Sequence, residues 1–353
     1  MIRYIPSFIL NQFENSNFSG EFNGYVLFFD IADFTKIGGE FRKHGKAGAE
    51  ELARFMEEVF GFPIGEIEKN GGFISFFAGD AFGALFPEGK PENIIAMVSC
   101  ILIHFRENPE YTCRFGKFVV KVRMTICYGK INWRIFRNDY QCEYVFFGEV
   151  LREMGEMSEY KEDVIFSYSA ANQIGLDCFN KLEVGYNLAE VESAETAELF
   201  FNYPFQESTK SKFIHPKFAS ETPSNEIRDA AYCFIDFTGV DEVNYEEVVT
   251  SLHRLLNQYG GHFNRFDATD KGLVGLMLFG IPITEGETLD RICRFTSDTI
   301  VEIPELSIGI ASGNVFAGFA GSKEVNEYTS LGSVVNLSIR LMSYAKKGEV
   351  LAD

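Results

Sequence analysis

The chain has 353 residues, more than one ordinary domain needs, and its hydrophobic fraction of 46% is enough for a core in each of two domains. Its 51 acidic and 32 basic residues give a net charge of -19. This balance excludes nucleic acid and anionic membrane surfaces as partners, because both are bound mainly through Lys and Arg. A small polyanionic substrate stays compatible with the charge if a metal ion accompanies it.

Two further classes are excluded by cysteine spacing and by the apolar segments. The seven cysteines are scattered and include no C-x-x-C pair, which argues against a disulfide framework and against a zinc site. Residues 1–17 do not form a secretory signal, since their short apolar run is interrupted by Pro6. The longest apolar stretch, 94–105, is shorter than the roughly 20 residues of a membrane-spanning helix. We expect a soluble, cytoplasmic protein without a membrane span.

The first part of the chain predicts a strand, a helix and a hairpin. Residues 25–30 (YVLFFD) form a short apolar run rich in β-formers, and residues 44–70 carry apolar side chains at a helical period. A Gly-Gly turn at 71–72 precedes two strands joined by an A-G-D turn. The elements expected after the long helix are strands 73–77 and 81–86, a helix at 91–106 and a strand at 117–128.

The same order of elements occurs a second time. Residues 186–226 collect Glu, Pro, Ser and Thr, which predicts a domain-end element and a linker. After them come an apolar strand at 231–237, a helix at 245–259, a Gly-Gly turn at 260–261, a hairpin that ends at 279 and a strand at 306–311. We therefore expect a first domain at 1–185 and a second at 227–353, related by duplication and facing each other across a cleft.

Two carboxylates stand at equivalent ends of neighbouring predicted strands. Asp30 ends the first strand, and Asp80 lies in the hairpin turn. In a strand–helix–hairpin unit both side chains project from the same end of the sheet, and such a pair suits Mg²⁺ with substrate phosphates completing its ligands. Spacing alone also allows two ordinary turn residues, because Asp is common in turns.

The local sequences decide between these interpretations. Residues 29–35 (FDIADFT) and 77–81 (FAGDA) resemble the two metal-binding motifs of class III nucleotidyl cyclases. The resemblance implies that Asp30, Ile31 and Asp80 hold two Mg²⁺ or Mn²⁺ ions. It also implies that backbone amides at Phe34 and Thr35 bind the triphosphate, for which the start of a helix is suited.

The second half resembles the base-recognition half of the same family. Residues 306–353 look similar throughout to the second cyclase domain of the soluble adenylyl cyclases. The resemblance implies that Lys271 and Thr329 read the adenine ring, that Asn336 orients the ribose and that Arg340 contacts the phosphate at the transition state. Asn336 and Arg340 are four residues apart, so they share one face of a helix.

These assignments predict the fold and the reaction. The fold class is α+β, with two ferredoxin-like cyclase domains in an intramolecular pseudo-twofold heterodimer and helices on one face of each sheet. One active site between the domains would convert ATP to cyclic AMP and pyrophosphate. A guanylyl cyclase is the near alternative, disfavoured because Lys271 cannot accept hydrogen bonds from guanine. A catalytically silent nucleotide-sensing module is the alternative from another class.

The chain departs from the family pattern at three places. Counting four residues past Lys271 gives Gly275 in the place of Asp80, so one metal carboxylate of the second half-site is missing. The cations that hold bicarbonate in soluble adenylyl cyclases fall on Phe76 and Gly155, so we expect no bicarbonate stimulation. Relatives continue beyond the position of Asp353 into a lysine that contacts the triphosphate. Either the chain is a fragment of a longer protein with a fused C-terminal regulatory region, or it lacks that contact.

Overall fold

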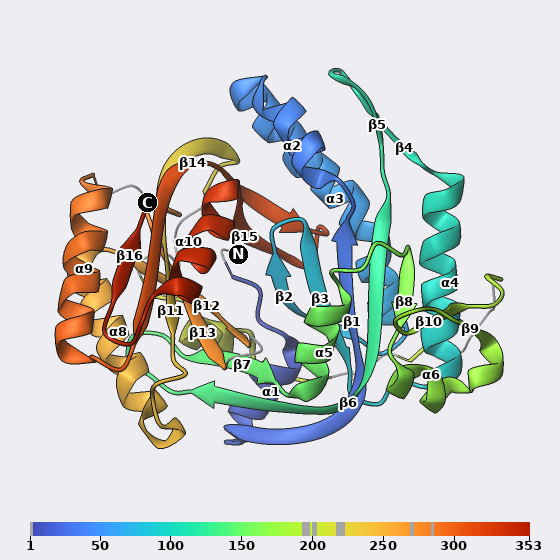
Figure 1. Ribbon diagram of the computed structural model, residues 1–353, viewed down its shortest axis with the longest axis horizontal. Coiled ribbons are helices and arrows are strands. Elements are labelled where there is room, and N and C mark those ends of the chain that lie inside the picture. The colour runs from blue at the N-terminus through green and yellow to red at the C-terminus, as the bar shows by residue number, and fades with distance from the viewer. Residues whose placement is uncertain (1–2, 193–197, 200–202, 217–222, 269–271, 284–285) are drawn as a thin grey trace.

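The chain folds into two halves that lie side by side. The computed structural model describes residues 3–192, 198–199, 203–216, 223–268, 272–283 and 286–353. Figure 1 shows α4 on the outer side of one lobe, α8 and α9 on the outer side of the other, and the N-terminus between them. No helix within these ranges combines the length and the apolar character that crossing a membrane requires.

The N-terminal half is built on an eight-stranded sheet in the order β2-β3-β1-β6-β8-β10-β9, with β7 paired to β6. Its helices are α1 (Ser7–Glu14), α2 (Phe34–Arg42), α3 (Gly45–Lys69), α4 (Pro91–Glu107), α5 (Glu149–Met157) and α6 (Tyr168–Ile174). Its strands are β1 (Ser19–Ile31), β2 (Phe73–Ala78), β3 (Ala81–Phe86), β4 (Glu110–Cys113), β5 (Gly116–Val119), β6 (Val122–Phe136), β7 (Glu143–Phe147), β8 (Val164–Phe166), β9 (Phe179–Lys181) and β10 (Tyr186–Leu188).

The C-terminal half is built on a six-stranded sheet in the order β12-β13-β11-β14-β15, with β16 paired to β14. Its helices are α8 (Tyr245–Tyr259), α9 (Thr288–Glu302) and α10 (Ser333–Tyr344). Its strands are β11 (Glu226–Asp236), β12 (His262–Ala268), β13 (Leu273–Phe279), β14 (Ser307–Gly321), β15 (Asn326–Leu331) and β16 (Val350–Ala352).

The strand pairings repeat between the halves, as the duplication in the sequence predicts. Strand β1 lies between β3 and β6 in antiparallel pairing, and β11 lies between β13 and β14 in the same way. Strand β6 then pairs antiparallel with β7 and parallel with β8, as β14 does with β15 and β16. The two halves therefore share one α+β topology.

Two expectations about the elements are wrong. The strand expected at 117–128 is two strands, β5 and β6, with a break at 120–121. Strand β10, in contrast, pairs with β8 and β9, so residues 186–188 fit the domain-end element expected at the start of 186–226. Helices also pack on both faces of each sheet, because α1 and α5 cover the face of the first sheet opposite α3, and α10 covers the face of the second sheet opposite α8. Strands β3 and β13 are buried along their whole length, which a sheet covered on both faces requires.

Phenylalanine fills much of the core of the N-terminal half. Phe29 of β1 stacks on Phe82 of β3 with ring centroids 4.8 Å apart, and Phe60 of α3 meets Phe82 edge-on at 5.0 Å. All three side chains are fully buried. Core packing thus accounts for the large number of Phe residues at these positions, without an aromatic binding surface.

A buried carboxylate joins the two halves. Glu143 of β7 lies 2.6 Å from Nη2 of Arg3 and 3.2 Å from Nε2 of His253, a residue of α8 in the other half. It also accepts a hydrogen bond of 2.8 Å from Nε2 of Gln141. Around this cluster β7 contacts β12 of the C-terminal half, and β15 contacts β2 of the N-terminal half. The boundary is therefore formed by equivalent strands of the two repeats.

Glycines in α3 provide a test of the packing. A Cβ added at Gly61 or Gly65 would meet nothing within 4 Å, whereas one added at Gly48 would lie 1.8 Å from the carbonyl oxygen of Phe41. We expect Gly61→Ala and Gly65→Ala each to raise the free energy of unfolding by about 0.5–1 kcal/mol, since Gly is a poor helix former. Gly48→Ala should lower it by about 1–3 kcal/mol through overpacking. Urea unfolding of the three variants measures these changes, and a stabilised Gly48→Ala would contradict the close helix contact.

His262 at the boundary predicts acid sensitivity. Burial, together with the nearby Arg3, His215 and His253, lowers the pKa of His262 to about 3. Because the folded state keeps this imidazole neutral, its contribution to stability is present above the unfolded pKa of about 6.5 and is lost as the pH falls below it.

Replacing His262 by Gln should remove this loss. Between pH 6.5 and 5, we expect the wild type to lose about 2 kcal/mol more unfolding free energy than His262→Gln, at about 1.4 kcal/mol per pH unit. Urea unfolding at the two pH values gives the comparison. Equal losses in both proteins would show that His262 does not titrate in this way.

Candidate active site

The strand–helix–hairpin unit places Asp30 and Asp80 together. Asp30 is the penultimate residue of β1, and Asp80 lies in the turn between β2 and β3. The backbone N–H of Ile31 donates to the carbonyl oxygen of Asp80 at 3.2 Å, which joins the two motifs directly. The expectation that Asp30 and Asp80 lie at the same end of the sheet is therefore confirmed.

The environment of the two acids disfavours two negative charges. Burial, and to a smaller extent the neighbouring Asp30 carboxylate, raises the pKa of Asp80 to about 7. Burial also raises the pKa of Asp30, against the opposing effect of Arg123, whose Nε lies 3.9 Å from its carboxylate. A cation bound at these carboxylates would stabilise their ionised forms.

This carboxylate pair fits a divalent metal ion. The described part of the chain holds no cluster of three or more His, Cys, Asp or Glu side chains arranged for a metal. Mg²⁺, however, is usually bound through one or two carboxylates, with water and substrate phosphates as the other ligands. Asp30 and Asp80 suit a metal that arrives together with a phosphate substrate.

Helix α2 begins immediately after the first acid motif. Asp33 adopts a left-handed conformation with φ 58°, which turns the chain from β1 into the helix at Phe34. Phe34 is buried, and Thr35 is exposed on the first turn. The first N–H groups of a helix have no partner within it, so this end offers donors to an anion.

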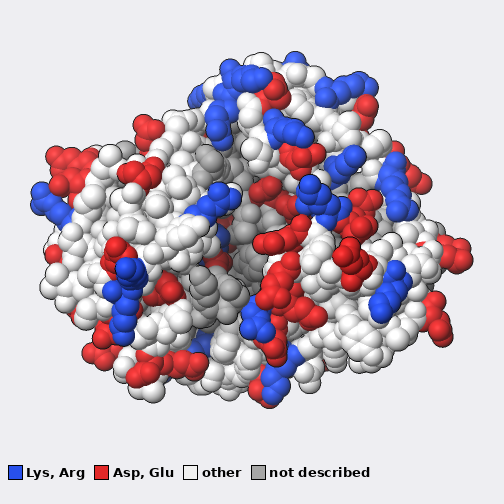
Figure 2. All heavy atoms as spheres, viewed as in Figure 1, with Lys and Arg blue, Asp and Glu red and all other residues white. Residues whose placement is uncertain are grey.

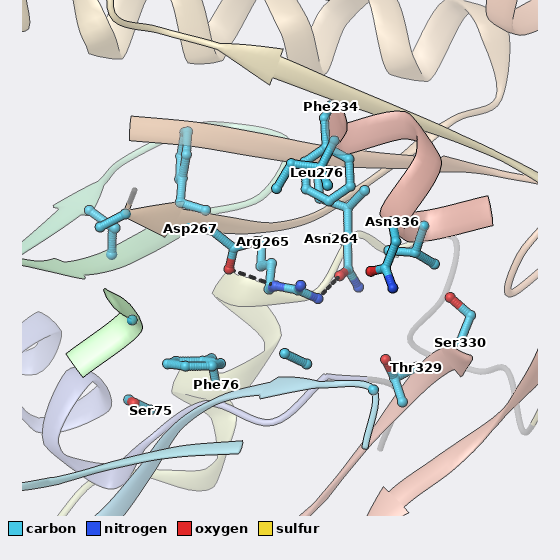
Figure 3. Close-up of a pocket in the computed structure, with 18 of the residues that line it drawn as sticks. Ser75, Phe76, Phe234, Asn264, Arg265, Asp267, Leu276, Thr329, Ser330 and Asn336 are labelled. Carbon is cyan, nitrogen blue, oxygen red and sulfur yellow. Dashed lines mark hydrogen bonds and ion pairs between the residues drawn. The ribbon is translucent and has the colours of Figure 1, made fainter. Parts of the chain in front are cut away.

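Residues of both halves line a cavity of about 370 Å³, and Arg265 is among them. Asp80 of the N-terminal half lines it, as do Thr329 of β15 and Asn336 of α10. Figure 3 shows Arg265 between Asp267 and Asn264, with Thr329, Ser330 and Asn336 to one side and Phe76 beneath. The Nε of Arg265 donates to Asp267 at 2.8 Å, and its Nη1 donates to the side-chain oxygen of Asn264 at 3.2 Å.

A second cavity of about 600 Å³ adjoins the first. Asp80 and Asn336 line both, and the second is also lined by Phe34 and Thr35 of α2 and by Arg340 of α10. Figure 2 shows a hollow in the middle of this face of the molecule, with acidic side chains along one wall. Residues predicted from the two separate halves therefore line two adjoining cavities, which together form the candidate cleft. Asp30 and Ile31 line neither cavity and lie beside Asp80.

One predicted site residue cannot be placed. Lys271 lies in the loop between β12 and β13, in the stretch 269–271 outside the described residues. The flanking Gly272 lines a third cavity with Tyr245, and this cavity shares Val145 and Ala268 with the first.

The expectation that Gly275 stands in the place of Asp80 is wrong. Asp30 pairs with Ala81, the residue after Asp80, and Asp236 of the second half pairs with Val274. The residue before Val274 is Leu273, which therefore corresponds to Asp80. The conclusion that this position of the second half-site has lost its carboxylate is still confirmed.

The same register identifies Arg265 as a residue that the motifs missed. Arg265 is the fourth residue after the turn at 260–261, as Phe76 is the fourth after the turn at 71–72. Both strands show a pairing irregularity just before these residues. The sequence-based count aligned the two halves at their hairpin loops, which differ in length. An alignment that starts at the two Gly-Gly turns would have identified Arg265 as the counterpart of Phe76. Phe76 and Gly155, expected in place of bicarbonate-binding cations, line the same cavity.

Arg123 is a second missed residue. It lies in β6 directly opposite Asp30 in β1. No motif in the sequence marks it, because only the pairing of two strands far apart in the chain brings it to the acid pair.

The chain is similar in sequence to known adenylate cyclases. No family model matches the chain. Adenylate cyclase type 10 of Homo sapiens is 24% identical over 392 residues, which cover 93% of this chain and 24% of that protein. The protein of the same name from Oryctolagus cuniculus is 24% identical, with 92% of this chain and 24% of that protein covered. The chain is a relative of the class III nucleotidyl cyclases.

A solved structure supports the fold of this cyclase relative over nearly its whole length. A class III adenylyl cyclase-like ATP-binding protein from Pseudomonas aeruginosa superposes with a TM-score of 0.62 at 13% identity, covering 95% of this chain and 84% of that one. The chain spans about a quarter of the length of the curated cyclases that it matches.

Proposed function

We propose that the chain is an adenylyl cyclase that converts ATP to 3′,5′-cyclic AMP and pyrophosphate. The observation that carries the proposal is the shared cleft, in which Asp80 of one half lies with Thr329, Asn336 and Arg340 of the other. The relatives named adenylate cyclase support ATP as the substrate. Since the reaction uses ATP, we also propose the cytoplasm as its location.

The two adjoining cavities divide the substrate between them. We assign the purine to the first cavity, beside Thr329 and Arg265, and the triphosphate to the second, beside the start of α2 and Arg340. Asn336 lines both cavities, which suits a residue that holds the ribose between them. Lys271 remains a candidate for the purine from the sequence resemblance alone.

The reaction is an in-line displacement at the α-phosphorus. The ribose 3′-oxygen forms a bond to phosphorus and gives up its proton, while the bond to the β-phosphate oxygen breaks and pyrophosphate leaves. Asn336 orients the attacking hydroxyl, and Arg340 balances charge on the phosphate oxygens. Amides at Phe34 and Thr35 hold the leaving group. Two Mg²⁺ or Mn²⁺ ions, when held by Asp30, Ile31 and Asp80, would make the hydroxyl more acidic and neutralise pyrophosphate.

Arg340→Ala tests the assignment of the transition-state contact. We expect it to lower kcat about 100-fold or more, because it removes a charged donor from the developing phosphate charge. The measurement is cyclic AMP production from ATP with Mn²⁺, and Lys346→Ala, an exposed substitution beyond α10, serves as the control. A rate close to that of the wild type for Arg340→Ala would contradict the mechanism.

The same assay separates the alternatives. Faster turnover of GTP than of ATP by the wild type would replace the proposal by a guanylyl cyclase. Binding of ATP and Mn²⁺ without any cyclic product would favour a nucleotide-sensing module. That alternative gains weight because the superposed Pseudomonas aeruginosa protein is described as ATP-binding.

Asp80→Asn tests the metal assignment without relying on turnover. We expect the variant to bind Mn²⁺ at least about tenfold more weakly in the presence of 3′-deoxy-ATP, which cannot cyclise, because a carboxylate ligand is lost. Isothermal titration measures the affinity. Asp33→Asn is the matched control, because Asp33 is 70% exposed and paired with Lys36 on the surface. Equal Mn²⁺ affinity in wild type and Asp80→Asn would remove Asp80 from the metal site.

A further inference from the structure

The second cavity holds a guanidinium group that the proposed reaction has not used. Arg42, the last residue of α2, lines this cavity together with Arg340 of α10. These two are the cations among the described lining residues, and Asp80 is the carboxylate. Neither arginine side chain makes a hydrogen bond or an ion pair with any residue that the structure describes. The neighbouring Lys43, in contrast, is paired with Glu40 at 2.6 Å.

One face of α2 leads from the acid pair to Arg42. Phe34, Gly38 and Arg42 are spaced four residues apart, as are Thr35 and Gly39, and all five line the cavity. A Cβ added at Gly39 would meet nothing within 4 Å, so this stretch of the helix presents bare backbone to open space. Side chains on a helix tilt toward its N-terminus, which would allow the guanidinium of Arg42 to reach back along this face toward Thr35.

The length of this face matches an extended polyanion. The seven steps of the helix from Thr35 to Arg42 rise roughly 10 Å. A triphosphate whose inner phosphate lies near Arg340 and the acid pair would extend along this face. Gly39 leaves room for its oxygens, and the guanidinium of Arg42 offers paired donors at the far end.

We propose that Arg42 binds the terminal phosphates of the substrate, opposite Arg340, so that both halves of the chain grip the triphosphate. The inference rests on the proposed function for the identity of the nucleotide. Because Asp30 and Asp80 add negative charge beside a polyanion, a cation at the outer end of the cavity lowers the repulsion that binding has to overcome.

The test compares three probes that differ in their phosphates. 3′-Deoxy-ATP, inorganic tripolyphosphate and 3′-deoxyadenosine are titrated, with Mn²⁺, into wild type, Arg42→Ala and Arg42→Lys. We expect Arg42→Ala to weaken binding of the first two probes about tenfold, to leave 3′-deoxyadenosine unchanged, and to be partly restored in Arg42→Lys. Lys43→Ala, the adjacent exposed cation that does not line the cavity, should bind all three probes as the wild type does.

Two results would overturn the inference. One is equal affinity of wild type and Arg42→Ala for tripolyphosphate and 3′-deoxy-ATP. The other is an equal loss for 3′-deoxyadenosine, since that would mean a general disturbance of the cleft. This test can be distinguished from the test of the cyclase proposal. Phosphate-dependent binding through Arg42 without production of cyclic AMP from ATP would refute the proposed reaction and would still support the contact between Arg42 and the terminal phosphates.

Discussion

The candidate site depends on the contact between the two halves of the chain. At this contact the carboxylate of Glu143 is fully buried, and it persists there because Arg3, His253 and Gln141 all approach it. A buried charge left without partners would cost several kcal/mol, so each of these groups constrains the others. Since Arg3 comes from the N-terminal segment and His253 from α8, the cluster holds three distant parts of the sequence in one arrangement.

This arrangement makes one cleft from two incomplete halves. Asp80 and the start of α2 come from the N-terminal half, and Thr329, Asn336 and Arg340 come from the C-terminal half. Neither set suffices for a nucleotide. The acids bear no group that recognises a purine, and the second half has Leu273 where the first has Asp80. After the duplication the two halves have thus diverged, so that one carries the acidic residues and the other carries the remaining polar residues of the cleft.

The asymmetry is also visible in the centre of the first cavity. Phe76 and Arg265 occupy equivalent positions in the two halves, yet one is an apolar ring and the other a charged group held by Asp267 and Asn264. A cavity with one apolar and one polar side is suited to a flat heterocycle, whose faces are apolar and whose edge forms hydrogen bonds. The charge of Arg265 is already balanced by Asp267. In the proposed purine site, Arg265 would therefore act mainly by the direction of its N–H donors and less by its charge.

The sequence by itself determined the elements that have a strong local signal. These include β1, the long helix α3, the hairpin after the first Gly-Gly turn and the helix at 245–259, because apolar periodicity and turn residues act over short distances. It also determined which residues carry the family motifs, and the acids Asp30 and Asp80 meet as their strand ends predicted.

Only the tertiary structure decided which residues face one another across the chain. The pairing of β6 with β1 brings Arg123 to Asp30, the register of β12 and β13 makes Arg265 the counterpart of Phe76, and the packing of α10 against the second sheet carries Arg340 toward α2. The hairpin loops of the two halves differ in length, so counting residues along the sequence does not align equivalent positions. The strand register aligns them, because it is set by backbone hydrogen bonds. The site is therefore a property of pairing and packing over long range, which local residue patterns do not encode.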